Sequence, residues 1–176
     1  MLVLAPILQK VATAAEPWSK FYGDSVVASV TVTFAHLAGL LFGGGLAISA
    51  DRATLRATRG SEDDRTQLLT DLSGTHRWIL VALTLIFVSG LLLALSDVKT
   101  FGTSAVYWTK MSLVVLLLIN GAILQRTEQQ LRGEMRLSPG SPEVSRAWSR
   151  LRLTAIASMA LWTSIVLAGV ILVEAS

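Results

Sequence analysis

His36 and Lys110 are the side chains best placed to do chemistry, because each lies inside a long apolar run. His36 lies near the middle of residues 26–50, which contain no Asp, Glu, Lys or Arg, and Lys110 lies near the start of residues 105–124. A neutral imidazole can bind a metal or a haem iron, and an ammonium can hold an anion. If these runs cross a membrane, both groups are costly there and indicate a functional site.

Small residues surround His36 at intervals of four, because Ala35, Gly39, Gly43 and Ala47 form a small-xxx-small stripe on one helix face. Two interpretations are open. In one, the glycines leave room for a flat cofactor such as haem b, or for copper, with His36 as the ligand. In the other, they admit a neighbouring helix, and His36 hydrogen-bonds a polar group on that helix.

A depth count at about 1.5 Å per residue brings His36 level with Ser89 and Trp162. A buried indole N–H needs an acceptor, so we favour the structural interpretation and predict a hydrogen bond between His36 and Trp162. His76 is expected at the far edge of the second span, about 15–20 Å away in depth. A single haem held between the two histidines is therefore geometrically poor.

Lys110 is expected roughly a turn and a half inside the outer surface of its span. In the simpler interpretation its ammonium reaches the interface and pairs with Asp97 or Asp24. In the other, it lies in an outward-facing polar pocket that receives an anion or a haem propionate. The candidate cofactor-binding residues are therefore His36, Gly39, Gly43, Trp162 and Lys110, with His36 as the candidate metal ligand.

No catalytic constellation accompanies these residues. The chain has no cysteine, which excludes thiolate metal sites and iron–sulfur clusters, and Gly43-Gly44-Gly45 lies within a span rather than in a phosphate loop. The sequence leaves enzymatic activity undecided and disfavours an enzyme that acts alone.

Four apolar runs must position the candidate residues. The chain is 52% hydrophobic and only 15% charged, against about 25% charged in soluble domains. The predicted membrane spans are residues 26–50, 78–96, 105–124 and 153–173. The sequence therefore predicts an all-α integral membrane four-helix bundle with up-down-up-down order. The short connection 98–104 predicts that the second and third spans lie antiparallel as neighbours.

The remaining segments are predicted as follows. Residues 1–25 form an interfacial segment, with Asp24 or Ser25 capping the first span, and residues 26–176 form the transmembrane domain. Residues 62–72 have a capping box at their start, but we favour a solvated connector there. Residues 125–152 continue the third span as a helix, turn at 139–142 and lead into the fourth span.

All eleven arginines fall in the connections 51–77 and 125–152. Positive charge is retained on the cytoplasmic side, so these loops are predicted to be cytoplasmic and both termini to lie outside. The lipid bilayer is then the main partner. The arginines lie beside apolar spans, so nucleic acid is not an expected partner.

Four short stretches carry a resemblance to a known group. The sequence resembles the membrane domain of the copper-resistance D family and related four-helix families in residues 34–44 (FAHLAGLLFGG), 89–93 (SGLLL), 107–111 (YWTKM) and 116–122 (LLLINGA). The resemblance implies a bacterial inner-membrane protein, with copper handling or haem binding as family-level functions. His36 and Lys110 are the matched polar positions.

Two functions follow as predictions. The first is an accessory or structural subunit of a larger membrane complex, for example a redox complex, which packs against other subunits or a second copy. The alternative is a haem- or metal-binding electron-transfer or copper-handling protein that uses His36.

Overall fold

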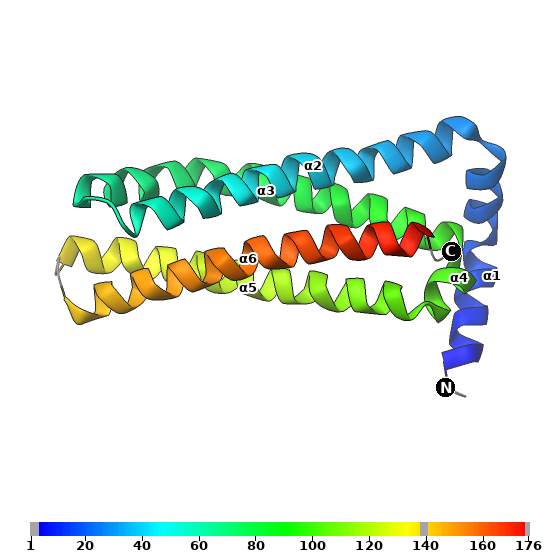
Figure 1. The fold of residues 1–176 in the computed structure, drawn as a ribbon. Coiled ribbons are helices and arrows are strands. Elements are labelled where there is room, and N and C mark those ends of the chain that lie inside the picture. The colour runs from blue at the N-terminus through cyan, green and yellow to red at the C-terminus, as the bar shows by residue number, and fades with distance from the viewer. Residues whose placement is uncertain (1–3, 138–140, 175–176) are drawn as a thin grey trace.

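The structure is a computed structural model that describes residues 4–137 and 141–174, and the regular elements in these residues are helices. In chain order they are α1 (Leu4–Asp24), α2 (Val26–Ala57), α3 (Glu62–Ser96), α4 (Val98–Thr103), α5 (Ala105–Leu137) and α6 (Pro142–Glu174). Figure 1 shows the four long helices side by side in an elongated bundle, with α1 across the end where α6 finishes. The predicted all-α class is confirmed.

Four helical segments are long and apolar enough to cross a membrane. They are Val26–Ala57, Arg77–Ser96, Ala105–Met135 and Pro142–Leu172. The predicted spans lie within these segments, apart from residue 173. These four segments are therefore those expected of a multi-pass membrane protein.

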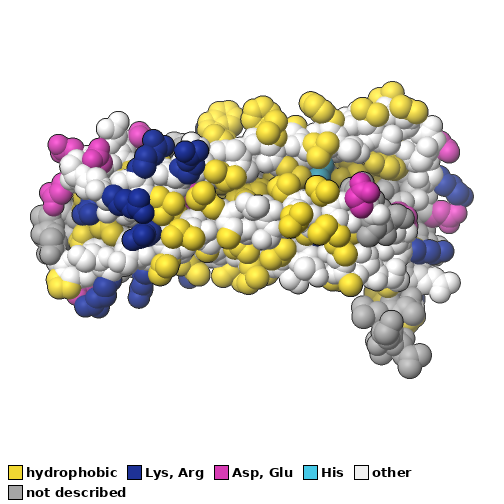
Figure 2. Space-filling view, in the orientation of Figure 1, with side chains coloured by type: hydrophobic (Ala, Val, Ile, Leu, Met, Phe, Trp, Pro, Cys, Tyr) yellow, Lys and Arg dark blue, Asp and Glu magenta, His cyan; other side chains and the backbone are white. Residues whose placement is uncertain are grey.

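The long helices exceed the thickness of a membrane. α2 has 32 residues, or about 48 Å at 1.5 Å per residue, whereas a hydrocarbon core is about 30 Å thick. The excess lies at the end of the bundle formed by 51–77 and 125–152, which we call the arginine-rich end. Figure 2 shows Lys and Arg side chains gathered there, beyond a largely hydrophobic middle.

The arginine-rich end has a hydrophobic core of its own. Leu131 and Leu151 are fully buried in this core. Leu68 and Leu72, from the start of α3, also belong to it and are nearly fully buried. The prediction of a solvated connector over residues 62–72 is therefore wrong. These leucines form one apolar face, and packing of that face in a cluster with Ala57 of α2 and with residues of α5 and α6 keeps the segment helical.

α3 begins as its sequence predicts. Ser61 is the N-cap, its hydroxyl accepts from the Asp64 N–H at 3.3 Å, and the Asp64 carboxylate accepts from the Ser61 N–H at 2.8 Å. This reciprocal pair is a capping box. From there α3 continues without a break to Ser96.

The bundle consists of two helical hairpins. α2 packs on α3, α5 packs on α6, and close contact between α2 and α6 joins the pairs. α3 and α5 run antiparallel, as predicted (Figure 1), but they are packed less closely than α2 and α6, and side chains of both meet around Trp162. The connection between them folds into α4, and α1 packs against α3 and α4 at this end.

α1 is tied to the bundle by hydrogen bonds to α3. The Trp18 indole Nε1 donates to the Leu92 carbonyl at 2.8 Å, and the Ser19 hydroxyl donates to the Ser96 carbonyl at 2.7 Å. The last carbonyls of a helix lack intrahelical donors, so Ser19 satisfies one of them. Ser25 caps α2, as predicted, by accepting from the Ala28 N–H.

The arginine-rich connection 125–152 has the predicted helical halves. α5 continues to Leu137 and α6 begins at Pro142, where a proline suits the first helical position. Residues 139 and 140 of the predicted turn lie outside the described residues.

Candidate functional site

His36 joins α2 to α3 through a hydrogen bond between its Nδ1 and the Ser89 Oγ, 3.1 Å apart. The Ser89 hydroxyl has one proton, which it donates to the Leu85 carbonyl at 2.6 Å. When the hydroxyl makes this bond, Ser89 accepts from His36, and the neutral imidazole is the Nδ1–H tautomer. The Nε2 lone pair then remains free for a ligand.

The predicted depth relation between His36 and Ser89 is confirmed by this bond, but the predicted hydrogen bond from His36 to Trp162 is wrong. Trp162 is only 4% exposed, and its ring packs on Gly44. Side chains of both helical hairpins, including Leu117 and Leu83, surround the Trp162 ring in a second hydrophobic cluster. This cluster lies within the apolar part of the bundle. Packing therefore decides the position of Trp162.

His76 lies on α3, thirteen residues before Ser89. At about 1.5 Å per residue this corresponds to roughly 20 Å along the helix. Since Ser89 contacts His36, the two histidines lie far apart in depth, as the sequence predicts.

The glycine stripe of α2 is filled by neighbouring helices. A Cβ at Gly39 would lie 2.8 Å from the Ile86 Cγ1, and a Cβ at Gly43 would lie 3.0 Å from the Ala82 Cβ. The glycines thus allow α3 to approach α2 closely. The space that a haem would need beside His36 is occupied by these side chains, so this stripe does not fit a haem.

The donor set does not fit a copper centre either. Among residues 4–137 and 141–174, no group of three or more His, Cys, Asp or Glu side chains is arranged to hold a metal ion. A lone imidazole is a poor site for copper, which binds several soft or nitrogen ligands.

Lys110 extends from α5 to α6. A Cβ added at Gly169 would lie only 3.3 Å from the Lys110 Nζ. The absence of a side chain at Gly169 therefore leaves room for the ammonium. The Lys110 ammonium forms no ion pair with a described carboxylate, so the predicted pairing with Asp97 or Asp24 is wrong.

Sequence reasoning missed the burial of Asp51, which begins the predicted cytoplasmic connection 51–77. Asp51 lies within α2, which continues to Ala57, and it is only 3% exposed. The buried Ser158 hydroxyl interacts with its carboxyl group, but Oδ2 has no hydrogen-bond partner. Asp51 follows Ala47 by four residues and so continues the small-residue stripe, a signal that could have placed it inside the bundle.

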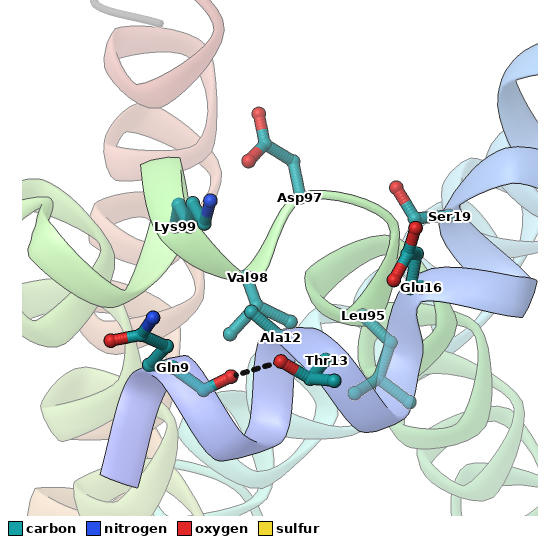
Figure 3. Close-up of a pocket in the computed structure, with 9 residues that line it drawn as sticks. All are labelled: Gln9, Ala12, Thr13, Glu16, Ser19, Leu95, Asp97, Val98 and Lys99. Atoms are coloured by element: carbon teal, nitrogen blue, oxygen red, sulfur yellow. Dashed lines mark hydrogen bonds between the residues drawn. The ribbon is translucent and has the colours of Figure 1, made fainter. Parts of the chain in front are cut away.

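A polar cavity of about 410 Å³ lies at the opposite end, between α1 and the turn from α3 into α4. Figure 3 shows Glu16 and Ser19 of α1 facing Asp97 and Lys99 around this cavity. The Lys20 ammonium, 2.8 Å from Glu16, holds the pKa of that carboxyl below its usual value. His36 and Lys110 do not line this cavity, so it is separate from the predicted site.

Comparisons with known proteins identify a family but no function. A family model described as a family of unknown function, DUF6644, matches residues 17–173, and the chain belongs to this family. Neither the curated proteins nor the solved structures contain a match to the chain.

Proposed function

We propose that this member of the DUF6644 family is a non-catalytic accessory subunit of a larger membrane assembly, in which Lys110 receives an acidic group of a partner subunit. The observation that carries the proposal is the state of Lys110. Its ammonium lies in an apolar span without a carboxylate partner among the described residues. Ionisable groups inside membranes pair with one another, and a partner subunit supplies the missing charge.

The exposure of α5 supports a partner on this helix. Only 6% of the apolar window of α5 is buried, compared with 33% of the window of α6. Trp108, Val115 and Leu118 are each more than half exposed on the same helix. This apolar surface suits lipid, a partner helix or a second copy of the chain.

The proposal includes an orientation. All eleven arginines belong to the arginine-rich end, and positive loops are retained in the cytoplasm. We therefore place this end in the cytoplasm of a bacterial cell and α1 on the outer face of its inner membrane. In this orientation Lys110 lies in the outer half of the membrane.

Mild solubilisation of the native membrane followed by size-exclusion chromatography tests the accessory role. We expect the protein to elute with a companion polypeptide, and Lys110→Gln to release it. Lys99→Gln is the matched control, because Lys99 is exposed on α4 and forms no ion pair with the described residues. A monomer without a companion, or equal retention in both variants, would contradict the proposal.

The alternative function, a haem- or copper-binding carrier that uses His36, is less well supported, because side chains fill the glycine stripe beside His36 and the described residues form no group of three or more metal ligands. An absorption spectrum and a metal analysis of the purified protein test it. A reducible Soret band or bound copper that is lost in His36→Ala supports a carrier, whereas a colourless, metal-free protein argues against it.

A further inference from the structure

A second cavity, of about 210 Å³, lies at the arginine-rich end, where the end of α2 meets α3 and α6. Its lining residues are Thr58, Arg65, Ser145, Trp148, Ser149 and Arg152. Two guanidinium groups contribute to the lining, and no carboxylate does. The cavity therefore carries net positive charge and offers hydrogen-bond donors.

Arg65 is held in place by its surroundings. Its guanidinium carbon lies 5.2 Å from the centroid of the Trp148 ring, a cation–π distance. Its Nε and Nη2 donate to the carbonyls of Ala57 and Thr58 at 3.4 Å, where α2 ends. Trp148 is itself only 5% exposed. These contacts use only part of the five N–H donors of Arg65 and fix the direction of the rest.

Arg152 brings the second charge to the cavity. It forms no ion pair with a described residue, whereas Arg132 pairs with Glu128 at 2.6 Å and Arg146 pairs with Glu143 at 3.7 Å. Arg152 directly precedes the apolar run of α6. The cavity thus lies where the bundle leaves the apolar part of its helices.

Hydroxyl groups complete the lining. The Ser149 hydroxyl donates to the Ser145 carbonyl at 3.1 Å, one turn earlier in α6. The Ser145 hydroxyl has no hydrogen bond with the described residues, so it is free to donate to a ligand. Two guanidiniums and a hydroxyl in one cavity suit a compact anion with several acceptor oxygens.

We propose that this cavity binds a phosphate group, with Arg65 and Arg152 as its charged ligands. A guanidinium matches a phosphate through two parallel charge-assisted hydrogen bonds, and the rigid placement of Arg65 lowers the entropy cost of forming them. Because the cavity adjoins the apolar run of α6, the headgroup of an anionic phospholipid can reach it. Free phosphate shares the same chemistry, and the experiment separates the two sources.

Native mass spectrometry of the full-length protein in detergent tests this site. The probes are dihexanoyl phosphatidic acid, inorganic phosphate and dihexanoylglycerol, which has the same chains without the phosphate. We expect Arg152→Gln to weaken binding of the phosphatidic acid about tenfold or more, the effect of losing one charge-assisted hydrogen bond. Arg150→Gln is the control, because Arg150 has the same charge two residues away and does not line the cavity.

The three probes give distinct outcomes. Phosphatidic acid bound more tightly than inorganic phosphate, with dihexanoylglycerol unbound, supports a lipid headgroup. Equal binding of both phosphates, with equal losses in Arg152→Gln, supports the same site with a soluble ligand. Equal affinity in Arg152→Gln and Arg150→Gln would overturn the proposal, as would binding of dihexanoylglycerol as tight as that of the phosphatidic acid.

A variant of Arg65 gives an independent reading. Arg65→Lys keeps the charge but loses the planar fork, so we expect weaker phosphate binding from a protein that still folds. Its thermal unfolding is measured in parallel, because Arg65 also donates to the end of α2. If Arg65→Lys is folded and binds phosphatidic acid as the wild type does, the bidentate role proposed for Arg65 is wrong.

Discussion

The Nδ1 of His36 and the Oγ of Ser89 lie 3.1 Å apart and connect α2 to α3 in the apolar part of the bundle. We expect Ser89→Ala to remove this side-chain hydrogen bond between the two helices. Hydrogen bonds between membrane helices contribute about 0.6 kcal/mol on average and about 1.7 kcal/mol at most, so a loss in this range is expected. Unfolding in mixed micelles measures it.

Ser112→Ala is the control for that prediction. Ser112 is an exposed serine of α5 whose hydroxyl donates to the Trp108 carbonyl in its own helix. Its removal should change stability by less than about 0.5 kcal/mol. Equal losses in both variants would mean that the bond between His36 and Ser89 contributes nothing specific.

Gly39→Ala should destabilise the bundle. The added Cβ would lie 2.8 Å from the Ile86 Cγ1 and 3.4 Å from the Ile86 backbone nitrogen, so the Ile86 side chain must move or the two helices must separate. Overpacking of this kind costs about 1–3 kcal/mol. Gly45→Ala is the matched control, because a Cβ there meets nothing within 4 Å. Thermal unfolding in detergent should place Gly39→Ala below the wild type and Gly45→Ala at or above it.

Asp51→Asn should not destabilise the protein. Asp51 is buried, its Oδ2 has no hydrogen-bond partner, and it forms no ion pair with a described cation. Ser158 alone interacts with this buried carboxyl group, so replacing it with a neutral group of the same shape is expected to raise the free energy of unfolding by about 1 kcal/mol or more. Denaturant unfolding measures this change, and Asp63→Asn, an exposed acid of α3, should change it little. A clear loss of stability in Asp51→Asn would show that the carboxylate has an unseen partner.

The capping box of α3 gives a pH dependence. Hydrogen bonds from the Ser61 hydroxyl and N–H hold the pKa of Asp64 below its usual value. A carboxyl whose pKa is lower in the folded state stabilises folding above its unfolded pKa of about 3.9, and this contribution is lost as the pH falls through the folded pKa. The melting temperature of the wild type should exceed that of Asp64→Asn at pH 7. This difference between the two melting temperatures should disappear once the pH falls below the lowered pKa of Asp64 in the folded state. A difference that is constant with pH would contradict this account.

Local sequence patterns predicted the elements of the fold well. An apolar run without charges has few alternatives to a membrane helix, because each backbone group is satisfied within the helix. The N-caps at Ser25 and Ser61 were also predictable, because each capping hydrogen bond joins residues that are three apart in the sequence. The helical character of residues 62–72 was missed because their leucines gain stability by packing on other helices, which no local pattern shows.

The candidate site was predictable in its residues but not in its contacts. Depth counting brought His36 level with Ser89 correctly, since helical rise is constant. It could not give rotation about the helix axis, so it paired His36 with Trp162 at the same level. The periodicity of four that ends at Asp51 did carry this rotational information.

The sequence by itself determined that the chain forms four long apolar helices, that its arginines gather at one end, and that His36 and Lys110 are the polar groups to explain. These properties depend on composition and on the fixed rise of a helix. Only the tertiary structure decided that Ile86 and Ala82 fill the glycine stripe. It also decided that the Lys110 ammonium packs beside Gly169 and not beside a carboxylate. Such choices depend on which helices pack together, and side-chain packing between distant segments leaves no local pattern in the sequence.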